Sequence, residues 1–231
     1  MRRILIGFVV LAAVLIGGDR LAVHYVENKV ATYVMHRENL ESKPNVEIKG
    51  FPFLTQVLSN DISKVTMTLP SVKAKTGRTK EIRIEDVSVT FTDVHTSHRL
   101  TEVTATQMTG SALIPYSAVS ALGPFTAAYG GQTPQDVGVI SLKPDKKSGL
   151  PRTLSVDVGV AVSDGTITFV GTNGGTRIAP IPPNLRPLLT SLVNSSHPVY
   201  GLPTSFTITA LDIEQDGVHV SLAGRNVEMS R

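Results

Sequence analysis

Histidines and carboxylates are the side chains of this chain that are best suited to acid–base or metal chemistry. His95 and His98 form the closest histidine pair, in a polar connection between two predicted strands. A zinc site needs three or four convergent ligands, and Asp93 is the only carboxylate nearby, so two solvated histidines are the favoured interpretation. Glu85 and Asp86 are adjacent, and adjacent strand residues face opposite ways unless a bulge rotates them. Neither pair predicts catalysis.

A second acidic group, Asp212, Glu214 and Asp216, occupies alternate positions before a turn. Such carboxylates can bind calcium, but a charged, solubilising strand edge is the preferred interpretation. A nucleophile elbow, a Walker loop, a dinucleotide fingerprint and a His-Glu-x-x-His motif are all missing. The chain has no cysteine, which excludes disulfides, thiolate ligands and thiol nucleophiles. We therefore expect no enzymatic activity, no catalytic residues, no metal and no cofactor.

Composition limits the partners further. The formal net charge of the 231 residues is +3, and subtracting Arg2 and Arg3 of the N-terminal segment leaves +1. This is too little for a protein that binds nucleic acid through a general basic field. Hydrophobic residues make up 41% of the chain, enough to bury a sizeable core. The sequence thus predicts a folded domain that does not bind nucleic acid.

The N-terminus has the layout of an export signal. Arg2 and Arg3 precede fifteen residues without charge, and Asp19 and Arg20 follow. Fifteen helical residues span roughly 22 Å, less than the ~30 Å hydrocarbon core of a bilayer. Residues 1–18 are therefore predicted to be a cleaved signal peptide or a retained membrane anchor of a protein exported to the periplasm or cell envelope. The candidate anchor residues are Ile4, Leu5, Ile6, Phe8, Val9, Val10, Leu11, Val14, Leu15 and Ile16.

The elements of the body, residues 19–231, follow from hydrophobic periodicity. An amphipathic helix begins after Asp19, and its packed side is predicted to carry apolar residues together with Tyr33 and Arg37. From Val46 onward the period changes to two, as in β-strands, and a change of parity at Glu85-Asp86 predicts a β-bulge. The clearest strand covers residues 154–162, and short helices are predicted at 115–122 and 184–193.

The order of these elements predicts one β-rich α+β domain. Long antiparallel strands with bulges favour a curved sheet wrapped around the N-terminal amphipathic helix and a space for ligand. The alternative is a β-sandwich with short helices. The pattern alone does not separate the two architectures.

The segment Gly50-Phe51-Pro52-Phe53-Leu54-Thr55-Gln56 is the most unusual part of the body. Pro52 cannot donate a ladder hydrogen bond, so the preceding strand must bend or end there. An apolar bend of this kind can line a cavity or its rim, or it can fill the end of the core. Phe125 and Tyr129 lie in a second apolar stretch that follows a Gly-Pro pair.

The exported N-terminus, the amphipathic helix, the segment Gly50–Gln56 and the β-rich remainder together resemble the LmeA-like phospholipid-binding family of the actinobacterial envelope. The resemblance implies a tubular lipid-binding fold similar to that of bactericidal/permeability-increasing protein, with acyl chains in an apolar tunnel. It implies phospholipid, including anionic phospholipid, and the membrane surface as partners. It also implies a role in the mannan elongation of lipomannan and lipoarabinomannan, or in envelope lipid homeostasis. The candidate lipid-binding residues are Phe51, Pro52, Phe53, Leu54, Phe125 and Tyr129. The alternative is a structural envelope protein with a dry core and a protein partner.

Overall fold

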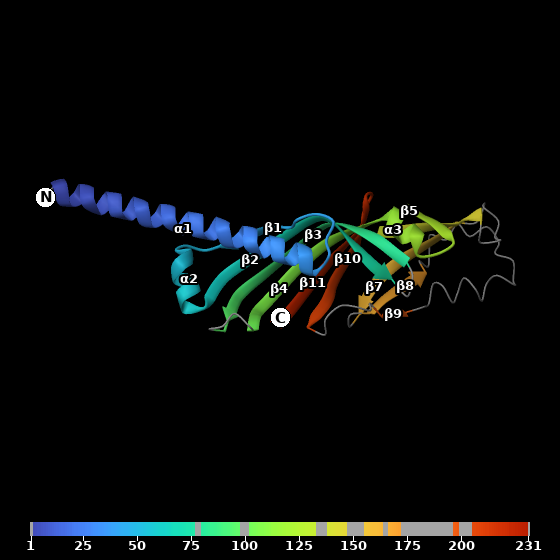
Figure 1. The fold of residues 1–231 in the computed structure, drawn as a ribbon. Coiled ribbons are helices and arrows are strands. Elements are labelled where there is room, and N and C mark those ends of the chain that lie inside the picture. The colour runs from blue at the N-terminus through green and yellow to red at the C-terminus, as the bar shows by residue number, and fades with distance from the viewer. Residues whose placement is uncertain are drawn as a thin grey trace. The chain divides into compact units, whose positions relative to one another are not determined.

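A computed structural model describes most of the chain as one long helix, two short helices and eleven strands (Figure 1). The described residues are 2–76, 80–97, 102–132, 138–146, 155–163, 166–171, 196–198 and 205–230. The helices are α1 (Arg2–Arg37), α2 (Phe53–Ser59) and α3 (Tyr116–Ala121). The strands are β1 (Asn45–Lys49), β2 (Asp61–Thr76), β3 (Lys80–Thr96), β4 (Glu102–Pro115), β5 (Phe125–Gln132), β6 (Gly138–Pro144), β7 (Val156–Ser163), β8 (Thr166–Gly171), β9 (Ser196–Pro198), β10 (Phe206–Ile213) and β11 (Gly217–Ser230).

Two sheets account for all of these strands. The larger has six strands in the order β1-β2-β3-β4-β11-β10, and the smaller has five in the order β5-β6-β7-β8-β9. The long antiparallel sheet of six strands is open, and together with α1 it confirms the predicted β-rich α+β fold. The chain also divides into two compact units: unit 1 comprises residues 1–70, 88–109 and 224–231, and unit 2 comprises residues 71–87 and 110–223.

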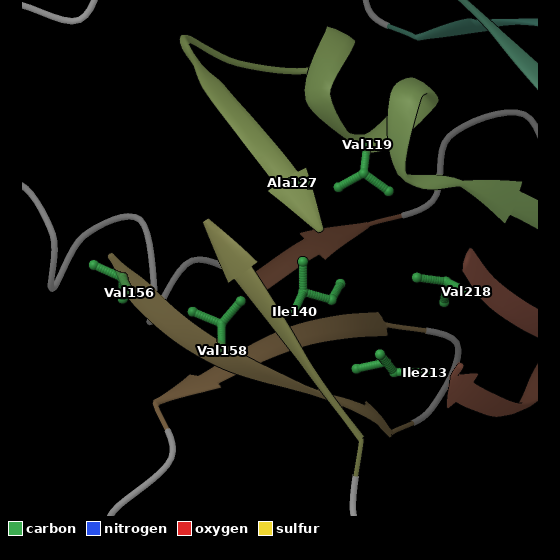
Figure 2. Packing of buried hydrophobic residues seen from close by; sticks show 7 residues of the cluster. All are labelled: Val119, Ala127, Ile140, Val156, Val158, Ile213 and Val218. Atoms are coloured by element: carbon green, nitrogen blue, oxygen red, sulfur yellow. The ribbon is translucent and has the colours of Figure 1, made fainter. Parts of the chain in front are cut away.

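The core of unit 2 is made of aliphatic side chains from α3, β5, β6, β7, β10 and β11. Figure 2 draws these side chains. Val158, which is 1% exposed, and Ile140, at 2%, are its most deeply buried members. The whole cluster consists of Val119, Ala127, Ile140, Val156, Val158, Ile213 and Val218. The smaller sheet therefore packs within unit 2 against α3 and the hairpin of β10 and β11.

Local signals in the sequence place several of these elements correctly. Pro115, in an extended conformation, precedes the first turn of α3, as expected for the short helix at 115–122. Asp86 has a positive φ of 48° within β3, a conformation typical of a bulge at the predicted position. The amide of Glu214 donates to the carbonyl of Gly217 and closes the predicted hairpin between β10 and β11. The predicted helix 184–193 lies outside the described residues.

Helix α1 is continuous from Arg2 to Arg37, so the candidate anchor residues and the amphipathic helix form one element. Its packed side is built on Val23 and Ala31, which are 7% and 3% exposed. Tyr33 and Arg37 were expected on that side, but they lie on the surface, where the Arg37 guanidinium donates to the Tyr33 hydroxyl at 3.0 Å. No helix among the described residues combines the length and the hydropathy needed to cross a membrane.

Candidate functional site

The segment Gly50–Gln56 lies in unit 1 between β1 and α2. Gly50 has a φ of +115° and the Phe51–Pro52 peptide bond is cis. Pro52, in an extended conformation, precedes α2, and Asn60 ends this helix with a left-handed φ of 62°. The sequence indicated only a bend here. The spacing of Leu54, Val57 and Leu58 is the signal that would have revealed the helix.

Phe53 anchors α2 to the core of unit 1. It is 2% exposed and forms a cluster with Val23 of α1 and Ile48 of β1. Alanine and valine side chains of α1 and residues at the start of β2 pack around this cluster. This role matches the expectation that the apolar segment fills the end of the core.

Two carboxylates of α1 hold the neighbouring backbone. Pro52 supplies no side-chain cap for α2, and Oδ1 of Asp19 instead accepts a hydrogen bond from the Leu54 amide at 2.9 Å. Oε1 of Glu27 accepts a hydrogen bond from the Ile48 amide at 2.8 Å. Asp19 is 2% exposed, so this cap is sheltered from water. The position of α2 relative to α1 is therefore fixed by a specific contact that spans 35 residues of sequence.

The polar end of the segment also has a structural role. The Thr55 hydroxyl donates to the Pro52 carbonyl at 2.8 Å, within the first turn of α2. Oε1 of Gln56 accepts a hydrogen bond from the Ser63 amide at 2.9 Å, which ties α2 to β2. The Ser63 hydroxyl donates to the Lys49 carbonyl at 2.8 Å. These hydrogen bonds explain Thr and Gln at these positions without a ligand.

Phe51 and Leu54 are large apolar members of the segment that the fold leaves exposed. Their exposed fractions are 54% and 46%, although both are large and apolar. The Arg20 guanidinium lies 5.2 Å from the centre of the Phe51 ring, a cation–π distance. Both apolar side chains are therefore accessible from outside the folded chain.

A pocket of about 540 Å³ opens beside Phe51. Its walls come from the segment itself and from the adjoining ends of β2, β3 and β4. The lining residues are Gly50, Phe51, Gln56, Asp61, Ile62, Ser63, Asp93, His95 and Thr106. Most of the lining residues have polar side chains, while apolar atoms contribute more than half of the lining surface.

His95 is exposed to solvent, as the sequence suggested, and its Nδ1 also contacts the Asp61 carboxylate beside this pocket. Both side chains are more than half exposed. Asp93, also in the lining, has a positive φ of 52°. His98 lies outside the described residues, so the predicted histidine pair has only one described member.

Phe125 and Tyr129 belong to unit 2, whereas Phe51, Pro52, Phe53 and Leu54 belong to unit 1. The rings of Phe125 and Tyr129 are partly buried and pack against the core cluster that Figure 2 draws. The structure therefore assigns them a packing role, and their contact with lipid stays a prediction.

His219 lies beside the acidic residues at the end of β10, and the sequence alone did not point to it. A carboxylate oxygen of Glu214, a carboxylate oxygen of Asp216 and an imidazole nitrogen of His219 lie within 4.8 Å of one another. Atoms of these kinds can coordinate a metal ion. His219 Nε2 lies 3.0 Å from Asp216 Oδ1, and this hydrogen bond raises the pKa of His219 and lowers that of Asp216. Burial raises the pKa of the nearby Tyr116 hydroxyl to about 12, and this hydroxyl donates to the Glu214 carbonyl. The group closes the β10–β11 hairpin.

The His219–Asp216 pair gives this hairpin a defined pH dependence. The contribution of Asp216 to the stability of the folded state is present above its ordinary pKa of 3.8. It is lost as the pH falls through the lower pKa that Asp216 has in the folded chain. The contribution of His219 is present below 6.5 and is lost as the pH rises through its raised folded value. We expect Asp216→Asn to lower the pKa of the His219 imidazole in an NMR titration. An unaltered His219 titration would contradict the pairing.

The chain matches a known protein family. Residues 17–223 match the family described as LmeA-like phospholipid-binding. No curated protein and no solved structure matches the chain. The matched range contains all of Gly50–Gln56 and most of the body, and it confirms the resemblance seen in the sequence.

Proposed function

Because the chain belongs to the LmeA-like phospholipid-binding family, we propose that it binds a phospholipid, without catalysis, in unit 1. The binding site is the pocket beside the corner that α1, β1 and α2 form. Phe51 contacts the lipid at the rim of the 540 Å³ pocket, and the polar lining receives the headgroup. The acyl chains lie along the exposed apolar side chains that continue from Phe51 to Leu54.

One observation carries this proposal: the unequal roles of the residues in Gly50–Gln56. Phe53, Thr55 and Gln56 have contacts that folding requires, whereas Phe51 and Leu54 remain exposed next to a pocket. Exposed apolar surface beside a concave polar site fits an amphiphile, which needs both environments at once.

The energy of such binding is modest in net terms. Each methylene removed from water contributes ~0.8 kcal/mol, but the bilayer offers an acyl chain the same gain. A lipid-binding protein in a membrane therefore competes with the bilayer. An open, partly polar pocket suits this competition because the lipid can enter and leave while its acyl chains stay close to apolar surface.

The finer role in the envelope rests on the family resemblance. In this proposal the protein is exported, stays associated with the membrane through α1 and binds anionic phospholipid. It supports the mannan elongation of lipomannan and lipoarabinomannan, or envelope lipid homeostasis. Deletion of the gene in its host, followed by analysis of these glycolipids, tests that role. Glycolipids of unchanged length and a phospholipid composition that also stays unchanged would reject it.

Lipid extraction tests the binding site directly. Residues 19–231, purified without detergent, are expected to carry phospholipid in stoichiometric amount by mass spectrometry. The Phe51→Asp substitution places a charge at the pocket rim and should remove most of this lipid. Tyr33→Asp is the matched control, because Tyr33 is a similarly exposed aromatic of unit 1, at 49%, that lies outside the segment.

Equal lipid loading in the wild type and in Phe51→Asp would remove Phe51 from the site. A folded wild-type protein that carries no lipid would favour the structural alternative with a protein partner.

A further inference from the structure

Exposed large apolar side chains are unevenly distributed among the described residues. Leu122 represents them in unit 2, at 41% exposed, whereas the others belong to unit 1. Those of unit 1 lie on α1 and in the segment from Phe51 to the end of α2. They are Val14, Leu15, Ile16, Leu21, Tyr25, Tyr33, Phe51, Leu54, Val57 and Leu58.

Helix α2 presents three of these side chains on one face. Leu54, Val57 and Leu58 have the i, i+3, i+4 spacing that aligns residues along a helix, and they are 46%, 45% and 82% exposed. Phe53 points into the core of unit 1 instead. A surface helix normally carries polar or charged residues on its outer side. No charged residue occurs between Gly50 and Asn60, so this outer face differs from that of an ordinary surface helix.

The position of α2 along α1 indicates what covers this face. The Asp19–Leu54 hydrogen bond places α2 beside the point where the uncharged stretch of α1, residues 4–18, ends. Val14, Leu15 and Ile16, which precede this point on α1, are large, apolar and exposed. The two apolar surfaces are therefore parts of one corner of unit 1.

The positive charge of Arg20, next to Asp19 on α1, favours a lipid surface over a protein partner at this corner. Arg20 is exposed, and its guanidinium lies over the Phe51 ring. A cationic group at the end of an apolar helical segment, next to an aromatic ring, is the usual arrangement at the headgroup layer of a bilayer. Arg2 and Arg3 flank the other end of the uncharged stretch.

We propose that the outer face of α2, formed by Leu54, Val57 and Leu58, docks on the surface of a phospholipid bilayer beside the uncharged part of α1. This surface goes beyond the lipid site proposed above, because docking by α2 does not require a lipid in the pocket. The 540 Å³ pocket, which shares Phe51 with this corner, then borders the headgroup layer. A phospholipid reaches Phe51 from the bilayer without its acyl chains crossing water.

The lack of cysteine in the chain allows a direct measurement of this contact. Leu58→Cys in the full chain is labelled with an environment-sensitive nitrobenzoxadiazole dye and mixed with phosphatidylcholine vesicles that contain a minor share of phosphatidylglycerol. Leu122→Cys, a leucine exposed in unit 2, carries the same dye as the matched control. Leu15→Cys reports on α1. Phospholipids with a quencher near the headgroup measure depth.

The dye at position 58 is expected to shift to shorter wavelength, to gain intensity severalfold and to be quenched by the shallow lipid quencher. The dye at position 122 should keep its emission in buffer. A dye at position 58 that stays in water while the dye at position 15 shifts would show attachment by α1 alone and overturn the proposal. Equal shifts at positions 58 and 122, or no shift at either, would also overturn it.

Lipid extraction from the same Leu58→Cys protein separates this proposal from the previous one. Bound phospholipid without a shift at position 58 rejects docking by α2 and leaves the pocket site standing. A shift at position 58 in a protein that carries no phospholipid supports docking and rejects the pocket site.

Discussion

We expect Phe53→Ala to lower the free energy of unfolding by about 3–5 kcal/mol, the usual cost of deleting a buried phenyl ring. Phe53 is 2% exposed and joins α2 to Val23 of α1 and to Ile48 of β1. Alanine leaves a cavity at this junction, because the Asp19–Leu54 hydrogen bond and the Gln56–Ser63 hydrogen bond hold the backbone of α2 in place. The surrounding side chains can therefore collapse only partly into the space.

Phe51→Ala is the matched control, since it removes the same side chain two residues earlier. Phe51 is 54% exposed, so its removal is expected to change stability by less than about 1 kcal/mol while it reduces lipid loading. Denaturant unfolding measures the global change, and hydrogen exchange of the α2 amides measures the local one. Similar destabilisation by the two substitutions would contradict the assignment of Phe53 to folding and of Phe51 to ligand.

These two phenylalanines also show what the sequence can and cannot predict. The segment was recognisable as unusual from its composition, and its bend was expected from Pro52. Which ring enters the core depends on the direction of the chain after Gly50, and this direction follows from a seven-residue helix. The spacing of Leu54, Val57 and Leu58 is a local signal for this helix, but it does not show which face is buried. Side chains of identical type and similar position thus acquire different roles only in the folded chain.

The β-rich part was predictable because its signals are local. Alternation of apolar residues marks strands such as β2 and β11, and Pro115 marks the start of α3. The parity change at Asp86 indicated the interruption of β3, where its positive φ occurs. Each signal lies within a few residues of the feature that it specifies.

The site was less predictable because its key contacts are distant in sequence. Asp19 was seen only as the first charge after an export signal, yet it caps α2 across 35 residues. Glu27 of α1 accepts the hydrogen bond of the Ile48 amide across 21 residues. Hydrogen bonds of this kind depend on tertiary placement, which residue spacing does not encode.

Gly50→Ala is expected to be the second most damaging substitution in the segment. At a φ of +115° any L-residue is strained, at a cost of about 1–3 kcal/mol. The added Cβ would also lie 2.5 Å from Gln56 Nε2 and 2.6 Å from Ser63 Oγ. Gln56 must then leave its position and lose the hydrogen bond that ties α2 to β2, so we expect lower stability together with lower lipid loading.

Gly131→Ala separates the two causes of this effect. Gly131 has a φ of +99°, but a Cβ there would meet no atom within 4 Å, so that variant has the backbone strain without the clash. The excess loss of unfolding free energy in Gly50→Ala over Gly131→Ala, measured in denaturant, is therefore the cost of displacing Gln56 and Ser63. Adding Gln56→Ala to Gly50→Ala should recover little stability, because it relieves one clash but also removes the bond to Ser63. Equal losses at the two glycines would mean that Gln56 is free to move and does not define the wall of the pocket.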